Sequence, residues 1–326
     1  MRCETSGMYD RQHMSLLLTR RRALESFALT SSFLRDALSR TSDSDRGMYL
    51  SLNSTLLSDR VRWPEFAHLA AETGFPGTDV MLEAAMKAGV GPTKGLLREL
   101  KIKPAILDFP VEFRKDAAAF EMSLSKLDEA GRFAAAIGCP RMITWIMPSS
   151  ETPKDELRRI YKQRFTESAR ILSRSDVRLG LEFLGPLHLR KMYRYEFIWR
   201  MNDMLAFAKE CGPNVGLLLD AWHWYHAGAT AEDIVAAGRE RIVHVHFDDS
   251  ANLPPEKIRD DERLMPGEGV IDLVSFLKAL QKIGYKDALS VEVFGRGLKN
   301  LTPEAAARLG LETSRAVFRK AGIEKG

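Results

Sequence analysis

The feature that most constrains the fold is an alternation, repeated eight times, between a short apolar stretch and a longer amphipathic one. The apolar stretches are rich in Val, Ile and Leu and are bounded by Gly, Pro or Asp. They lie at residues 48–53, 78–82, 103–109, 141–147, 177–185, 215–222, 242–249 and 288–295. This composition is typical of parallel strands whose two faces are both buried.

The segments between these stretches carry helical periodicity. We expect helices at residues 64–73, 116–137, 153–173, 273–283 and 303–321. The third of these opens with Pro and acidic residues, which favour a helix start. A strand followed by a helix, eight times over, predicts a single-domain α/β protein of the (β/α)8 TIM-barrel type, in which the sheet closes on itself. We place the barrel domain at residues 48–326, with no second domain.

Composition places the chain among ordinary soluble proteins. Of its 326 residues, 45% are hydrophobic and 28% are charged, and the formal net charge is +4. No concentrated basic surface is evident, so we expect no nucleic-acid partner. The absence of a run of 18 apolar residues argues against a membrane span. Three scattered cysteines form neither a disulfide framework nor a paired metal motif.

Residues 1–47 are predicted to form an N-terminal extension that is disordered or signal-like. The segment "TRRRALESFALTSSFLRDALS" has an arginine cluster before a partly apolar stretch, loosely like a twin-arginine export signal. Glu25, Arg35 and Asp36 interrupt or border the apolar part, which favours a frayed amphipathic extension instead. We therefore expect a cytoplasmic protein, with a periplasmic one as the alternative.

Ligand-type side chains occur at the ends of four consecutive predicted strands. They are Glu182 in "LGLEFLG", Asp220 in "GLLLDAW", His244 and His246 in "IVHVHFDD", and Glu292 in "LSVEVFG". Successive members are about one strand–helix unit apart. Active sites of TIM barrels lie at the carboxyl ends of the strands, so these groups are predicted to converge at one mouth.

A divalent metal ion explains such a convergence. An unpaired buried carboxylate costs several kcal/mol, and the neighbouring strand ends supply Asp and His rather than Lys or Arg. Three carboxylates without a cation would repel one another. An oxygen-rich set with one imidazole suits Mn, Co, Zn or Mg. The alternative is a purely structural network of salt bridges.

The two histidines of one strand must be distinguished. His244 and His246 share strand parity and point to the same face, so parity cannot choose between them. His246 lies nearer the carboxyl end of the strand and is predicted to be the metal ligand. His244 is expected one layer deeper, as a packed and hydrogen-bonded histidine.

Four further residues are candidate substrate contacts. His223 follows Asp220 by three residues, and Arg263 precedes the turn "LMPGEGVID". An arginine there could hold a substrate oxygen, although a solvated loop charge is the alternative. His188, in a Pro-containing loop, is a weaker candidate. Trp145 could stack on a sugar ring, but ordinary packing explains it equally well.

The phrases "LEFLG", "VGLLLDAWHW", "HFDD", "DERLMPGEGVIDL" and "LSVEVF" resemble those of the xylose isomerase-like TIM-barrel superfamily of sugar phosphate isomerases and epimerases. Within it, the likeness is to the inosose (2-keto-myo-inositol) isomerase branch. The resemblance implies metal ligands at Glu182, Asp220, His246 and Glu292, with substrate contacts at His223 and Arg263. Ketose 3-epimerases of this superfamily tend to carry an acid where this chain has His188, which argues against that activity.

The expected function is a metal-dependent isomerase or epimerase of a keto-sugar or cyclitol. One divalent ion would stabilise an enediolate while Glu182 and Glu292 remove and return the proton. A hydride shift is the rival route. The substrate is expected to be a small, unphosphorylated molecule, because the charges of the loop "GRGLKN" read as solvent-exposed. The oligomeric state is open, with a homodimer considered.

Three other functions were weighed. A metal-dependent lyase or dehydratase would use the same enediolate to expel a hydroxyl, and the sequence does not separate it from an isomerase. An endonuclease of this fold needs further histidines on strands two to four, whose ends read "DVML", "AILDFP" and "WIMPSS". A non-catalytic sugar-binding protein would have no need of the intact ligand set.

Overall fold

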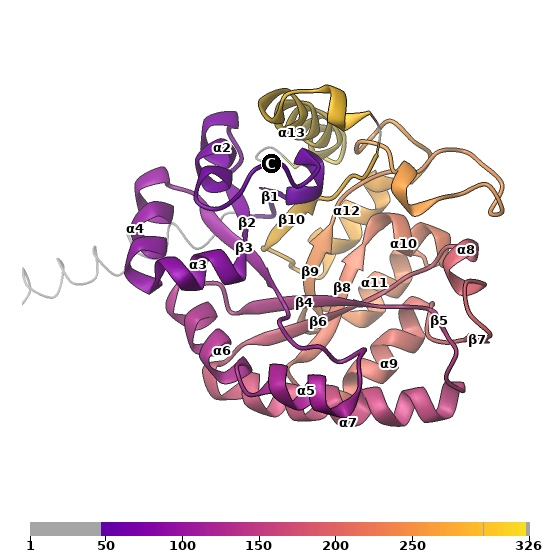
Figure 1. Cartoon of the computed structure of the whole chain (residues 1–326). Coiled ribbons are helices and arrows are strands. Elements are labelled where there is room, and N and C mark those ends of the chain that lie inside the picture. Colours follow the sequence, from indigo (N-terminus) through magenta and orange to yellow (C-terminus); the bar gives the residue numbers. More distant parts are fainter. Residues whose placement is uncertain (1–46, 296, 324–326) are drawn as a thin grey trace, which may run out of the picture. The chain divides into compact units, whose positions relative to one another are not determined.

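The computed structural model describes residues 47–295 and 297–323. Within these residues eight parallel strands close into a barrel, seen at the centre of Figure 1. The strands are β1 (Tyr49–Leu52), β2 (Gly77–Val80), β3 (Lys103–Asp108), β4 (Arg141–Ile146), β6 (Arg178–Phe183), β8 (Val215–Asp220), β9 (Ile242–His246) and β10 (Ala288–Val291). Each lies within or one residue outside its predicted stretch, and the predicted TIM-barrel fold is confirmed.

Helices surround the strands. They are α2 (Glu65–Thr73), α3 (Leu82–Ala88), α4 (Val90–Leu100), α5 (Ala117–Leu124), α6 (Leu127–Ala136), α7 (Lys154–Leu172), α8 (Leu187–Arg190), α9 (Met201–Cys211), α10 (Ala221–His226), α11 (Ala231–Ala237), α12 (Leu273–Lys282) and α13 (Pro303–Lys320). Among the described residues, no helix has both the length and the apolar character needed to cross a bilayer.

The helix predicted at 116–137 is two helices, α5 and α6, separated at Ser125 and Lys126. Ser123 and Ser125 each donate a side-chain hydrogen bond to a carbonyl three residues earlier, and Ser123 also accepts from the Glu112 amide. Such local bonds compete with helix continuation. The apolar periodicity continues across the break, which is why the sequence pattern suggested one helix.

The predicted N-terminal extension, with its twin-arginine-like segment, covers residues 1–47, and Gly47 is its only residue in the described part of the chain. Residues 1–46 lie outside the described part of the chain, as does Arg296 of the "GRGLKN" loop. These expectations therefore remain sequence predictions.

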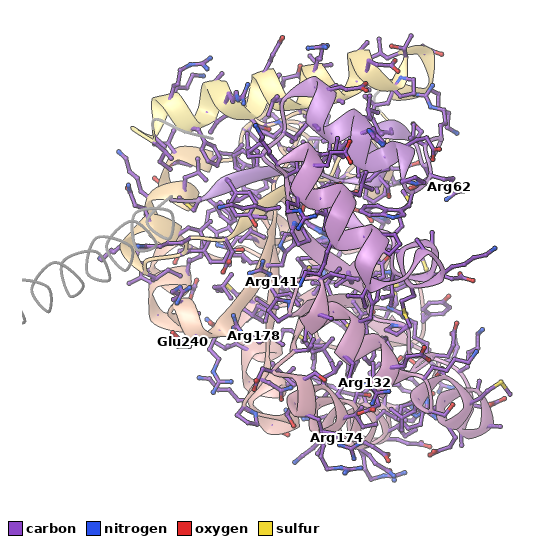
Figure 2. All side chains as sticks on the ribbon, turned by 90° about the vertical axis from the view of Figure 1, so that its left-hand side faces the viewer. Arg62, Arg132, Arg141, Arg174, Arg178 and Glu240 are labelled. Atoms are coloured by element: carbon purple, nitrogen blue, oxygen red, sulfur yellow. The ribbon has the colours of Figure 1, made fainter. Side chains whose placement is uncertain are left out.

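The amino-terminal ends of the strands are held by arginines. Arg141 forms an ion pair with Asp287 (Nη1–Oδ1 2.5 Å), and Arg178 donates to the carbonyls of Glu240 (2.6 Å) and Ile242 (3.3 Å). Figure 2 shows Arg141, Arg178 and Glu240 near one another on this side of the barrel. Arg141 thus links the start of β4 to the residue before β10, and Arg178 links the start of β6 to that of β9, at the end opposite the predicted site.

An aromatic cluster anchors the loop between β3 and α5 to α7. The buried ring of Phe113 packs against Phe165 (centroids 4.6 Å apart) and edge-on against Tyr161 (5.2 Å). Aromatic pairs of this kind contribute about 0.5–1.5 kcal/mol beyond their buried area. This loop is therefore a fixed part of the wall at the carboxyl end of the barrel.

A small antiparallel sheet extends the wall at the same end. β5 (Ser149–Ser150) pairs with β7 (Tyr195–Glu196), and Ser149 Oγ donates to the Leu189 carbonyl at 2.6 Å. Two-residue strands carry too little periodicity to be recognised from sequence. The sheet joins the loops that follow β4 and β6.

Candidate functional site

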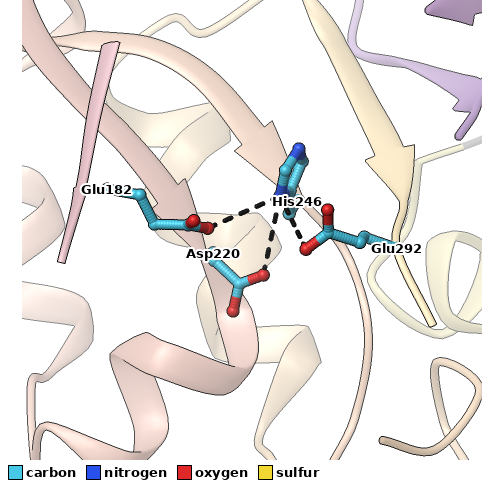
Figure 3. Close-up of side chains that lie close together, drawn as sticks. All are labelled: Glu182, Asp220, His246 and Glu292. Atoms are coloured by element: carbon cyan, nitrogen blue, oxygen red, sulfur yellow. Dashed lines mark ion pairs between the residues drawn. The ribbon is translucent and has the colours of Figure 1, made fainter. Parts of the chain in front are cut away.

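Four adjacent strands bring the predicted ligand set together, as Figure 3 shows. Glu182 lies in β6, Asp220 and His246 end β8 and β9, and Glu292 directly follows β10. One possible ligand atom from each residue lies within 4.8 Å of all the others. His246 Nδ1 is 3.5 Å from Glu182 Oε1, 3.7 Å from Asp220 Oδ2 and 3.1 Å from Glu292 Oε2.

This geometry fits a divalent ion. In a tetrahedral site with metal–ligand bonds of about 2.0–2.1 Å, the ligand atoms lie roughly 3.4 Å from one another. Glu182 Oε1 and His246 Nδ1 are buried and form no well-aligned hydrogen bond among the described residues, although they lie at ion-pair distance from each other. Buried polar atoms without partners are costly, and here they are atoms that a metal would bind.

The electrostatics of the cluster also favour a cation. Burial raises the pKa of Glu182 to about 8. Burial opposes charge on His246, but Glu292 and Glu182 outweigh it and hold the His246 pKa well above its ordinary value. Without an ion the cluster therefore retains protons at neutral pH. Ligands must lose their protons to bind a metal, so the binding of an ion at this cluster would release protons.

Arg263 contradicts one step of the sequence argument. Its guanidinium, only 1% exposed, donates through Nη1 to Asp220 Oδ2 (2.8 Å) and Glu292 Oε2 (2.9 Å). The strand ends themselves supply no Lys or Arg, but Arg263 reaches the carboxylates from the loop after β9, so the premise that they converge without a cation is wrong. Burial disfavours ionisation of Asp220, but Arg263, His223 and His246 hold the Asp220 pKa well below its usual range.

Two acids that the sequence analysis did not select complete the surroundings of Arg263. Asp248 Oδ2 accepts from Nη1 at 2.7 Å, and Asp260 Oδ1 accepts from Nη2 at 2.8 Å and from Nε at 3.1 Å. Counting Asp220 and Glu292, one guanidinium faces four carboxyl groups. A single positive charge does not balance them, and burial accordingly raises the Asp248 pKa well above its ordinary value. The cluster thus retains capacity for a further cation.

The turn that carries Arg263 is fixed by Asp249. Its carboxylate accepts backbone N–H groups from Ser250, Gly267, Gly269 and Ile271, at 2.8–3.0 Å. The Asp249 backbone also pairs with Leu264 in both directions. The acidic pair after β9 therefore has two roles: Asp248 contacts Arg263 directly, and Asp249 holds the loop that delivers it.

His223 lies beside the ligand set at the first turn of α10. Its backbone N–H donates to Asp220 Oδ1 at 2.8 Å, so the proposed ligand is also the cap of the helix. His223 Nε2 lies 3.1 Å from Arg263 Nη2, which can only donate. Burial lowers the His223 pKa, so the ring is neutral and carries its proton on Nδ1.

A cavity of about 450 Å³ opens above the cluster. Its walls include Glu182, His246 and Glu292 and the predicted substrate contacts His223, Arg263 and Trp145; further lining residues are Asp108, Phe109, Arg114, Leu189, Asp260 and Phe294. Trp145 is 42% exposed, as a ring available to a ligand would be. His188 does not line this cavity. It lies in α8 beside the Ile258 backbone, so the structure does not bring it to the site.

His244 lies below the site. It is fully buried, and its Nε2 is 2.8 Å from Ser290 Oγ, which donates to Asp79 Oδ1 at 2.6 Å. This agrees with the expected packed and hydrogen-bonded histidine. Asp79 also accepts from Ser51 and Asn53. This polar layer could not be predicted from the sequence, because single Ser and Asp residues in short strands carry no distinctive pattern.

Comparison with protein families matches residues 93–317 to the xylose isomerase-like TIM barrel family. The chain belongs to this family. Inosose isomerase of Bacillus velezensis is 28% identical to it over 221 residues, which are 67% of this chain and 77% of that protein. The resemblance drawn from the strand-end motifs is thereby confirmed.

Solved structures agree with the family. A xylose isomerase domain protein from Alicyclobacillus acidocaldarius matches 86% of this chain and 100% of its own, with a TM-score of 0.78 and 30% identity. The IOLI protein, solved with a bound zinc atom, matches 84% of this chain and 99% of its own, with a TM-score of 0.72 and 22% identity. The similarity to the IOLI protein shows that the two chains share the same fold.

Proposed function

We propose that this protein is a divalent-metal-dependent isomerase or epimerase of a keto-sugar or cyclitol of the inosose type. The observation that carries the proposal is the convergence of Glu182, Asp220, His246 and Glu292 beneath a cavity large enough for one sugar ring. The similarity to inosose isomerase supports the reaction class.

Glu182, Asp220, His246 and Glu292 would hold the ion, and the oxygen-rich set suits Mn, Co, Zn or Mg. When bound, the ion would supply Lewis-acid polarisation of a substrate carbonyl. Asp220 is fully buried and contributes no surface to the cavity, which suits it to a ligand role alone.

Glu182 and Glu292 are the candidate acid–base pair. Both line the cavity, and Figure 3 shows them approaching His246 from different sides. In the proposed reaction one carboxylate removes the proton beside the substrate carbonyl, and the other returns it to the neighbouring position. Because they come from different strands, they can reach different carbons of one bound substrate.

His223 is proposed to hold a substrate oxygen. Its Nε2 accepts from Arg263, which leaves Nδ1–H as a donor with no partner among the described residues. A neutral imidazole that donates to a developing oxyanion stabilises it without transferring a full charge. Arg263 is then a positioning residue that fixes His223, Asp220 and Glu292, since these contacts occupy its donors.

The test is proton exchange in deuterated water. Inososes and keto-sugars would be incubated with the protein and Mn, Co, Zn or Mg, and followed by NMR. We expect deuterium at the carbon beside the carbonyl, loss of exchange after chelation, and loss in Glu182→Gln. The exposed Glu83→Gln in α3 is the matched control and should retain full exchange.

Other outcomes would separate the rival functions. Product formed without deuterium would contradict the proton-transfer scheme and indicate a hydride shift. Product lighter by one water would indicate a dehydratase acting on a similar keto-sugar. Binding that survives chelation, with no turnover of any substrate, would indicate a non-catalytic sugar-binding protein.

A further inference from the structure

A second arginine, Arg114, faces the same cavity from the loop between β3 and α5. Its guanidinium carbon lies 3.8 Å from the ring centroid of Trp145 and 4.2 Å from that of Phe113. Its Nη2 donates to Thr144 Oγ1 at 3.2 Å and to the Trp145 carbonyl. Stacking on aromatic rings fixes the plane of the guanidinium and leaves its edge available for a ligand.

The backbone on both sides of Arg114 is held in place. Arg164 of α7 donates through Nη1 to the carbonyls of Phe113 and Lys115, at 2.6 Å each. The Phe113 ring is fully buried in the aromatic cluster described above. Arg114 is therefore presented to the cavity by a rigid loop, so little ordering cost remains when a ligand binds.

Arg114 forms no ion pair among the described residues, although the Glu112 carboxylate acts on its charge from a distance. The nearby Glu112 pairs with Lys115 at 3.3 Å, and Asp116 caps α5 by accepting from the Ala119 amide at 2.8 Å. No protein acceptor is recorded for Arg114 Nε or Nη1 within that part of the chain. Arg263, by contrast, is surrounded by carboxylates. Arg114 thus retains both positive charge and unused donors.

Trp145 connects this arginine to the metal-ligand cluster. It is paired in register with Glu182 across β4 and β6, and both line the cavity. Arg114 lies over the Trp145 ring. A ligand that reaches from the cluster to Arg114 would therefore cross the exposed tryptophan, which is the surface a sugar or cyclitol ring favours.

We propose that Arg114 binds an acidic substituent of the substrate, a carboxylate or a phosphate. Guanidinium groups bind both through paired N–H donors. The inference rests on the proposed function for the position of the substrate carbonyl, and it narrows the substrate class to acidic keto-sugars or keto-cyclitols. The sequence analysis favoured an unphosphorylated substrate, which a carboxylate would satisfy.

The test is calorimetric binding to the Mn²⁺-loaded protein of three cyclic polyols: neutral myo-inositol, the carboxylate quinate, and myo-inositol 1-phosphate. We expect at least one anionic probe to bind about tenfold or more tightly than myo-inositol, which is the usual size of one charge-assisted contact. Arg114→Gln should abolish that preference, so that the anionic probe binds no more tightly than myo-inositol. The anionic probe that loses affinity distinguishes carboxylate from phosphate recognition.

Control variants make the test specific. Arg62→Gln removes an exposed arginine that does not line the cavity and should bind all three probes as the wild type does. Arg114→Lys keeps the charge without the planar fork and should retain part of the preference. Arg114→Lys also replaces Arg114→Gln in the binding test if Arg114→Gln does not fold.

Three results would overturn the inference. The first is equal binding of the neutral and anionic probes by the wild type, and the second is binding of none of them. The third is an equal loss for all three probes in Arg114→Gln, which would mean that Arg114 only supports the Trp145 ring. Calorimetry measures binding and needs no turnover. If the wild type prefers an anionic probe but catalyses no deuterium exchange, the result counts against the proposed reaction and leaves the role of Arg114 standing.

Discussion

At the scale of single residues, Arg263 decides how the cluster is held. The guanidinium is buried and contacts Asp220, Asp248, Asp260 and Glu292. Buried ion pairs often add little net stability when both partners are present, but removing one partner leaves the other charges uncompensated. Arg263 therefore matters for folding and for the position of the ligand set.

Arg263→Gln is accordingly expected to destabilise the metal-free protein by about 3–5 kcal/mol, the range for breaking a buried ion pair. The exposed Arg62→Gln should change the free energy of unfolding by about 0.5 kcal/mol or less. Urea unfolding monitored by circular dichroism in the presence of chelator measures both. Equal stability of the two variants would show that the carboxylates do not depend on Arg263.

Glu182 predicts the pH dependence of metal binding. Its pKa is raised to about 8 by burial, so below that pH a metal must displace a proton from it. Mn²⁺ affinity should therefore fall as pH drops below 8, by about tenfold per pH unit for each proton displaced. Glu182→Gln should bind more weakly and with a shallower slope. Isothermal titration between pH 6 and pH 9 tests this, and identical slopes would contradict it.

The same shift has a consequence for stability. The pKa of Glu182 in the folded protein lies above its unfolded value of 4.5, so this carboxyl group holds its proton more tightly in the folded state. Its contribution to the stability of the metal-free protein is present at low pH and is lost as pH rises from 4.5 to about 8. A bound divalent ion removes this loss because it stabilises the ionised carboxylate.

The convergence of Glu182, Asp220, His246 and Glu292 could be predicted because strand ends fix their positions. In a closed parallel barrel, side chains at the carboxyl ends of adjacent strands must meet, so identity and order were enough for Glu182, Asp220 and His246. The turn motif placed Arg263 at the site as a substrate contact, but its hydrogen bonds to Asp220 and Glu292 depend on an irregular loop with no periodicity and could not be derived. His188 lies in α8, beyond the end of β6, and its neighbour Leu189 lines the cavity while His188 does not.

At the scale of elements, the loop from Leu264 to Ile271 depends on close approach of its backbone to Asp249. An added Cβ at Gly269 would lie 2.2 Å from the Ser250 carbonyl and 2.4 Å from Asp249 Oδ1. Neither contact can be relieved by rotating a flexible side-chain end. The loop delivers Arg263, so damage here should extend to the ligand cluster.

Gly269→Ala should therefore destabilise the protein by about 1–3 kcal/mol, as overpacking does, and should weaken Mn²⁺ binding. Gly95→Ala in α4 is the contrasting variant, because its Cβ would meet nothing within 4 Å. It should stabilise α4 by up to about 1 kcal/mol through helix propensity and leave Mn²⁺ affinity unchanged. Thermal unfolding and metal titration of both variants give the comparison; a stable, normally binding Gly269→Ala would refute the role of the loop.

Sequence patterns predicted the regular elements better than the irregular ones. The eight strands and the long helices α7, α12 and α13 have many buried apolar positions, so their periodicity is clear. The break between α5 and α6 depends on serine side chains that form local hydrogen bonds, and β5 and β7 depend on loop packing. Arg114 lies in the loop between β3 and α5, where no periodicity marks it, and only the structure shows that it stacks on Trp145.

At the scale of the whole barrel, the four proposed metal ligands lie at the ends of four separate strands, so one ion would link β6, β8, β9 and β10. An ion that binds only the folded state stabilises it by mass action, by about 2.7 kcal/mol at a concentration one hundred times the dissociation constant. For a domain of this size we expect Mn²⁺ to raise the melting temperature by roughly 5–10 °C. Calorimetric melting with and without Mn²⁺ should show this rise in the wild type and not in Glu182→Gln.

The central claim is that these four groups bind one divalent ion, and metal content after equilibrium dialysis tests it most directly. The wild type and the exposed-site variant His68→Gln should each retain one Mn, Co, Zn or Mg ion per chain, measured by plasma mass spectrometry. His246→Leu and Asp220→Asn, checked for folding by circular dichroism, should retain none at the same free-metal concentration. Unchanged metal content in these two variants, or a wild type that binds no ion, would contradict the account.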